Sequence, residues 1–148
     1  MLILPRLLLA LALLTVGLAV QAEQSQDFGQ YVVHYSAILT DSLLPEVARQ
    51  YGITRSKNRG MLTMTVLKKV MNTAGTPVEA KVSGTATNLS QQLRTLDLRQ
   101  IRDGSAVYYL SEFPIANREV LDFNLQVTPK GENNAFTVKF RQEFFTEG

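Results

Sequence analysis

Residues 120–144, VLDFNLQVTPKGENNAFTVKFRQEF, decide the fold class of this 148-residue chain. Apolar side chains recur at every second position from Leu121 to Val127 and again from Phe136 to Phe140, and Phe144 continues the second series. This alternation is typical of strands that bury one face and expose the other. The polar segment 128–134, TPKGENN, separates the two series and contains turn-forming residues. The stretch therefore predicts an antiparallel hairpin with one buried face.

A second hairpin is expected just before this one. Asp103-Gly104 is a strong two-residue hairpin signal, and it separates the segments 93–102 and 105–113, each of which we expect to form one strand. Tyr108 and Tyr109 are neighbours in the second of these strands, so they must face opposite sides of the sheet. We expect one tyrosine in the core and the other on the sheet surface or in a contact patch.

Three further strands are expected nearer the N-terminus, at 30–40, 61–71 and 78–89. The first two are rich in β-branched, aromatic and other large apolar residues. The third is low in large apolar groups and has Gly84 in its middle. A glycine inside a strand indicates a bulge or the close approach of another part of the chain.

One short helix is predicted within residues 44–60, LPEVARQYGITRSKNRG. Pro45 is tolerated only in a first helical turn, and Gly52 suits the left-handed conformation that ends a helix. A helix of about two turns is not stable alone, so its apolar face must dock on the sheet. The residues expected on that face are Leu44, Val47, Ala48 and Tyr51.

These segments amount to about seven strands and one short helix near the N-terminus, in a single domain over residues 30–148. The pattern predicts an all-β protein, an antiparallel β-sandwich of immunoglobulin-like type. The chain has no cysteine and no tryptophan, so the disulfide and the buried tryptophan of antibody domains are both missing. The comparison with such domains therefore concerns architecture only, and burial alone must stabilise the fold.

The first residues predict export. Arg6 is followed by an apolar run at 7–20 and by Val20-Gln21-Ala22, which suits a signal peptidase. We expect a signal peptide at 1–22, cleavage after Ala22, a mobile polar leader at 23–29 and a periplasmic location. A run of about 14 residues is shorter than the roughly 20 needed to span a bilayer, so no membrane span is expected after cleavage.

Charge and residue inventory exclude several classes of function. Fifteen basic and 13 acidic residues give a net charge of +2, which falls to about +1 when Arg6 is removed with the signal peptide. Such a balance predicts no nucleic-acid partner. His34 is the single imidazole and cysteine is absent, so the usual transition-metal ligand set is missing. No catalytic motif is present, and we expect no cofactor, no metal and no enzymatic activity.

The most basic loop follows the predicted helix and is the candidate binding site. Its residues Arg55, Lys57, Asn58 and Arg59 could donate hydrogen bonds to an anionic ligand or to an acidic patch on a periplasmic protein. In the opposing interpretation the loop is only solvated, or its arginines pair with carboxylates such as Glu119.

A non-enzymatic binding or accessory module is therefore the predicted function. The alternative is a structural or assembly protein in which an exposed strand edge, at the 136–145 end of the chain, pairs with another chain.

Four stretches of the chain resemble one known family: FGQYVVHYSA at 28–37, LPEVARQYGITRSKNRG at 44–60, GTATNLSQQ at 84–92 and IRDGSAVYYLSEF at 101–113. It is the domain of unknown function 4426 family, which consists of exported proteins of Gram-negative bacteria. The resemblance covers nearly the whole mature chain, and the run RSKNR at 55–59 is its most distinctive part. It implies a periplasmic β-sandwich and brings no established activity, substrate or cofactor.

Overall fold

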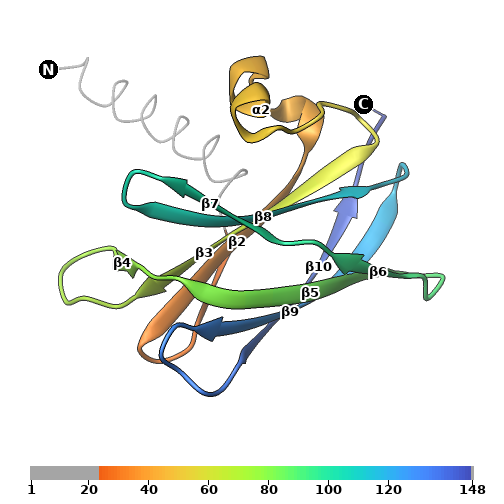
Figure 1. The fold of residues 1–148 in the computed structure, drawn as a ribbon. Helices are drawn as coiled ribbons and strands as arrows, with labels where there is room; N and C mark the ends of the chain where they lie inside the picture. The colour runs from red at the N-terminus through yellow and green to blue at the C-terminus, as the bar shows by residue number, and fades with distance from the viewer. Residues whose placement is uncertain (1–23, 148) are drawn as a thin grey trace, which may run out of the picture.

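The computed structural model describes residues 24–147, which form two antiparallel sheets packed face to face (Figure 1). The predicted signal peptide and its cleavage after Ala22 lie outside the described residues. The elements are β1 (Gln24–Asp27), β2 (Tyr31–Leu39), the 3-10 helix η1 (Thr40–Ser42), α2 (Pro45–Tyr51), β3 (Arg59–Lys68), β4 (Thr76–Pro77), β5 (Ala80–Asn88), β6 (Leu93–Leu96), β7 (Arg99–Asp103), β8 (Ala106–Pro114), β9 (Glu119–Pro129) and β10 (Phe136–Phe144).

The order of strands confirms the predicted β-sandwich. One sheet, here sheet A, has the order β1-β2-β3-β8-β7, with the two-residue β4 also paired to β3. The other, sheet B, has the order β10-β9-β5-β6. Without the short β1 and β4, these orders correspond to the A-B-E-D and G-F-C sheets of immunoglobulin domains, and β6 takes the place of the added strand C′.

The C-terminal hairpin forms as its periodicity predicts. In β9 and β10, Leu125 lies opposite Val138 and Phe123 lies opposite Phe140. Leu125, Phe123 and Val138 are all at most 1% exposed, and the Phe123 and Phe140 rings stack with centroids 4.5 Å apart. Phe113 from sheet A meets Phe123 edge-on across the core. The two sheets are therefore joined by interdigitated aromatic and aliphatic side chains.

The segment 93–102 is not the single strand that its sequence predicts. It forms two strands in different sheets, β6 beside β5 in sheet B and β7 beside β8 in sheet A. The chain passes from one sheet to the other at Asp97 and Leu98, while Leu96 stays buried in the core. A strand that changes sheets keeps its extended backbone, so period-two patterning does not reveal the crossing.

The mobile leader predicted at 23–29 is also wrong for Gln24–Asp27. These residues form β1 and pair with β2, and the Gln26 side chain donates to the Tyr35 hydroxyl at 3.0 Å. The strand is polar because it lies at a sheet edge and buries little side-chain area, so main-chain hydrogen bonds stabilise it. With β1, β4 and the divided segment, the described chain has ten strands in place of about seven.

Strand β9 approaches Gly84 closely, as the position of this glycine within a strand predicts. A Cβ atom at Gly84 would lie 2.5 Å from Leu125 Cδ2 and 3.1 Å from the main-chain oxygen of Asn124. Both atoms belong to β9, the neighbouring strand in sheet B. The absence of a side chain at this position allows β5 and Leu125 to pack together.

We predict that Gly84→Ala lowers the free energy of unfolding by about 1–3 kcal/mol, because the new methyl group overpacks the core against Leu125. Urea denaturation followed by circular dichroism measures the change. The neighbouring variant Ser83→Ala, at an exposed position of the same strand, should stay within about 0.5 kcal/mol of the parent. Equal stability of the Gly84→Ala variant and the parent would contradict the prediction.

Candidate functional site

The predicted helix is present and has the expected ends. Pro45 occupies its first turn, and Gly52 ends it with φ 67° and ψ 37°, in the left-handed region. One residue of its predicted apolar face is misplaced, because Leu44 is 70% exposed. Leu44 is the N-cap, so it precedes the helical repeat and does not share the direction of Val47. Leu43 packs in its place.

Helix α2 covers part of the outer face of sheet A, the face turned away from sheet B (Figure 1). Ala48 of the helix and Ile53 just after it are buried against Met61 of β3 and Leu110 of β8. This cluster is separate from the main core between the sheets. The helix and the loop that follows it are therefore positioned by sheet A.

The basic loop, residues 53–60, is fixed to the fold through its main chain. The Ser56 amide donates to Thr40 Oγ1 at 2.8 Å, and the Thr40 hydroxyl donates to the Ser56 carbonyl oxygen at 3.1 Å. Thr40 is fully buried. Farther along, the Ile115 amide donates to the Asn58 carbonyl oxygen at 2.9 Å. The loop is thus tied to two other segments, and this geometry restricts its movement.

The four predicted site residues differ in whether their side chains are paired within the fold. Arg59 begins β3, and its Nη2 lies 3.5 Å from Glu112 Oε1 on β8, so a carboxylate of the fold already compensates its charge. Arg55 Nη2 donates to the Asp41 main-chain oxygen at 2.9 Å. Lys57 is exposed and has no hydrogen bond or ion pair within residues 24–147. Asn58 is exposed, and its side chain makes no hydrogen bond within the same residues.

Glu119 pairs with an arginine that the sequence did not indicate. Arg94 of β6 donates to it through two nitrogens, Nη1 to Oε1 and Nη2 to Oε2, both at 3.0 Å. Asn88 Nδ2 and the Ala116 amide also donate to this carboxylate. Burial acts to raise the pKa of Glu119, but the hydrogen bonds from Arg94, Asn88 and Ala116 outweigh it and leave the pKa below its ordinary value. The loop arginines do not bind Glu119.

The charges that remain uncompensated at this end of the sandwich are mainly positive. Arg55 donates only to a carbonyl, which does not neutralise it, and Lys57 and Arg118 are exposed without an ion pair in the described chain. The turn that holds Arg118 follows Ile115, which is bonded to Asn58. Asp41 contributes one negative charge nearby, and Glu147 contributes another, because its amide donates to Asn117 Oδ1 in the turn of Arg118 at 3.3 Å. The end of the sandwich around the basic loop therefore has a small excess of positive charge.

The strand edge named in the alternative prediction is partly covered. Strand β10 is an edge strand of sheet B, but Gln26 Nε2 from β1 donates to the Lys139 main-chain oxygen at 3.1 Å. Gln142 of β10 in turn donates to the Ala37 main-chain oxygen at 2.8 Å. Polar side chains thus join β10 to sheet A, which reduces the main-chain groups available to an added strand.

Residues 24–147 have neither a cluster of metal-ligating side chains nor a membrane-spanning helix. Residues 24–147 contain no group of three or more histidine, cysteine, aspartate or glutamate side chains that could hold a metal ion. His34 lies opposite Thr65 in sheet A. None of the helices in residues 24–147 has the length and apolar character needed to cross a membrane.

These features define a class of protein, a small immunoglobulin-like β-sandwich with one helix and an anchored basic loop on its surface. The chain belongs to the DUF4426 family, a domain of unknown function, whose model matches residues 25–147. This confirms the resemblance seen in the sequence. Comparison with curated proteins gives no match.

Solved structures agree with the fold. The DUF4426 family protein PA0388 from Pseudomonas aeruginosa PAO1 is 38% identical, with a TM-score of 0.75 over 86% of this chain and 98% of that chain. FetP from uropathogenic Escherichia coli strain F11, recombinantly expressed in the periplasm of E. coli, is 10% identical, with a TM-score of 0.60 over 84% and 94% of the two chains.

A copper-bound variant of FetP is also 10% identical and has a TM-score of 0.60, over 83% of this chain and 95% of that chain. At this identity the likeness to FetP shows the fold alone.

Because Glu119 has a lowered pKa in the fold, we predict that it stabilises the protein above its ordinary pKa of 4.5 and that this contribution is lost as the pH falls through its folded value. Glu119→Gln should lower the free energy of unfolding at pH 7 by about 2 kcal/mol, since charged hydrogen bonds are lost. Denaturation at pH 7, 5, 4 and 3 measures the difference, which should shrink towards acid.

Glu143→Gln on β10 is the matched control, because Glu143 is exposed, and its stability should stay within about 0.5 kcal/mol of the parent at pH 7. A difference between Glu119→Gln and the parent that stays constant from pH 7 to pH 3 would refute the role given to the ionised carboxylate.

Proposed function

We propose that this protein is an exported, periplasmic binding module whose basic loop contacts an acidic patch on a partner protein. Arg55 and Lys57 are the contact residues in this proposal, and Arg118, in the turn after Ile115, is a further exposed cation at the same end of the sandwich. Arg59 and Asn58 are assigned a supporting role, since Arg59 is paired with Glu112 and the Asn58 carbonyl holds Ile115. The proposal is of a non-enzymatic function that needs no cofactor.

One observation supports the proposal: the exposed cations Arg55 and Lys57 lie on a loop that hydrogen bonds fix to the fold. Thr40 fixes the loop at Ser56, between Arg55 and Lys57, by two hydrogen bonds. A fixed loop loses less conformational entropy when it binds than a mobile one does. Because no carboxylate in the described chain pairs with Arg55 or Lys57, their charges remain available to attract an anionic group.

A protein surface suits this arrangement better than a small anion does. Arg55 and Lys57 lie on either side of Ser56 on an exposed loop, and neither lines any of three pockets found on the described surface. Small ligands usually bind in concave pockets that bury most of their surface. Charged residues on an exposed loop instead contribute to the rate and specificity of association with another macromolecule.

Pairing through the edge of β10 is the second candidate function. It rests on the position of β10 at the border of sheet B, and the hydrogen bond from Gln26 to Lys139 weakens it. Such pairing depends on main-chain hydrogen bonds, so it should tolerate charge reversal in the basic loop.

We predict that Arg55→Glu/Lys57→Glu abolishes crosslinking to a specific partner in intact periplasm, because like charges would then face each other. Binding of that partner to the parent protein should also weaken steeply between 0.05 and about 0.5 M salt, as the Debye length falls from more than 10 Å to only a few Å. Pull-down at a series of salt concentrations measures both effects.

The matched control is Lys81→Glu/Lys139→Glu, which makes the same charge change at two exposed lysines of sheet B. This control should retain the partner, and both double variants should melt within a few degrees of the parent. Retention of the partner by the loop variant, or binding that is independent of salt, would refute the basic-loop proposal and favour the edge of β10.

A further inference from the structure

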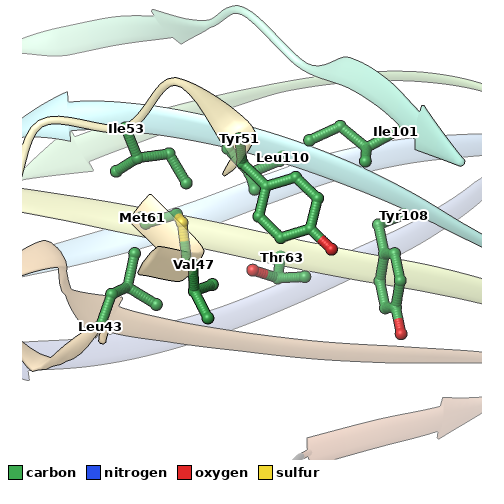
Figure 2. Close-up of a pocket in the computed structure, with 9 residues that line it drawn as sticks. All are labelled: Leu43, Val47, Tyr51, Ile53, Met61, Thr63, Ile101, Tyr108 and Leu110. Carbon is green, nitrogen blue, oxygen red and sulfur yellow. The ribbon is translucent and has the colours of Figure 1, made fainter. Parts of the chain in front are cut away.

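A cavity lies between helix α2 and the outer face of sheet A (Figure 2). Neither Arg55 nor Lys57 lines it. Its volume is about 220 Å³, and it is partly open to the surface. Figure 2 shows Tyr51 and Tyr108 together on one side, with Leu43 and Ile53 on the other. The complete lining is Leu43, Val47, Tyr51, Ile53, Met61, Thr63, Ile101, Tyr108 and Leu110.

Hydrogen bonds hold helix α2, which covers this cavity, in place. Arg99 Nη2 on β7 donates to the Tyr51 main-chain oxygen at 2.6 Å, and the Tyr51 hydroxyl donates to Asp103 Oδ2 at 3.2 Å. These contacts fix the C-terminal end of α2 relative to β7. Together with the packing of Ala48 on the sheet, they hold the helix in position over the cavity.

The size of the cavity limits what it can hold. Pockets for drug-sized ligands usually measure about 300–1,000 Å³, whereas an engineered apolar cavity of about 150 Å³ binds benzene. At about 220 Å³ this cavity lies between the two. A molecule with one ring and one or two small substituents fits this range.

The chemistry of the lining limits the occupant further. Six of the nine lining side chains are aliphatic or thioether, and two are tyrosine rings. Aromatic rings gain from offset or edge contacts with other rings beyond the area they bury. Thr63, on the floor formed by β3, supplies the only polar side-chain group apart from the two tyrosine hydroxyls. A charged group would be left without a partner of opposite sign in this lining.

We propose that this cavity is a binding site for a small, uncharged, single-ring aromatic molecule with a hydroxyl group, which contacts Tyr51 and Tyr108 and hydrogen-bonds to Thr63. The cavity includes Ile53 of the basic loop but neither Arg55 nor Lys57, so this proposal does not rest on the proposed contact with an acidic partner.

Phenol is the probe for this site, and cyclohexanol is its saturated analogue of similar size. In ¹H–¹⁵N spectra of the purified protein, phenol should cause saturable shifts at Thr63, Ile101 and Tyr108 with a dissociation constant of about 1 mM or below. Cyclohexanol should bind about two- to tenfold more weakly, because it lacks ring contacts with the tyrosines. Hexanoate, a charged aliphatic probe, should bind more weakly still.

Two variants fill the cavity from opposite sides. Thr63→Leu adds volume at the floor, and Val47→Phe adds volume at the helix. Each should weaken phenol binding at least tenfold. Thr65→Leu is the matched control: Thr65 is half-buried on the same face of β3 and does not line the cavity, so phenol binding should be unchanged. Thr63→Val, which removes only the hydroxyl, should weaken phenol binding about two- to tenfold.

Thermal melting establishes that each variant is folded, and if Thr63→Leu does not fold, Val47→Phe provides the test from the helix side. The proposal is overturned if phenol produces no saturable shifts, if the shifts map to residues away from the cavity, or if Thr65→Leu weakens binding as much as the filling variants do. Cyclohexanol or hexanoate binding as tightly as phenol would overturn the aromatic class of ligand.

Discussion

Contact between the two sheets is the constraint on which the rest of this structure depends. With no cysteine in the chain, no disulfide can join them, so burial of side chains must hold sheet A against sheet B. Phe113 of sheet A meets Phe123 and Phe144 of sheet B, and Tyr35 meets Phe140 with ring centroids 4.5 Å apart. Aromatic residues bury large areas and have preferred mutual orientations, which makes them suitable for this role.

The outer layer of the protein is built on this core. Helix α2 has only seven residues, too few to be stable alone, and it exists because Met61 and Leu110 offer it an apolar surface. The basic loop continues from that helix and is tied to Thr40, the first residue of η1. Both candidate sites, the exposed cations and the cavity under α2, therefore occupy the same outer side of sheet A without sharing residues.

The parts of the fold that the sequence predicted are those governed by local chemistry. The alternation in β9 and β10 depends on which face is buried, Pro45 and Gly52 act within one helical turn, and Gly84 marks a close contact because it lacks a side chain. Each of these signals can be recognised within a few residues.

The parts that sequence reasoning missed depend on partners far along the chain. The exchange of sheets between β6 and β7 is set by which strands lie beside them, and β1 is held by main-chain bonds that its polar side chains do not indicate. Similarly, Arg59 resembles Arg55 in the sequence, but of the two only Arg59 forms an ion pair, with Glu112, 53 residues away. Consequently the charge pattern identified the loop but could not show which of its cations form an ion pair within the fold. The order of strands also bears on how quickly the protein can fold. Strand β3 pairs with β8 in sheet A and β5 pairs with β9 in sheet B, so the central pairs of both sheets join segments that lie far apart in the sequence. Long loops must close before these pairs can form, and the lost chain entropy is not repaid until they do. A protein dominated by such non-local contacts is therefore expected to fold more slowly than a helical protein of similar size.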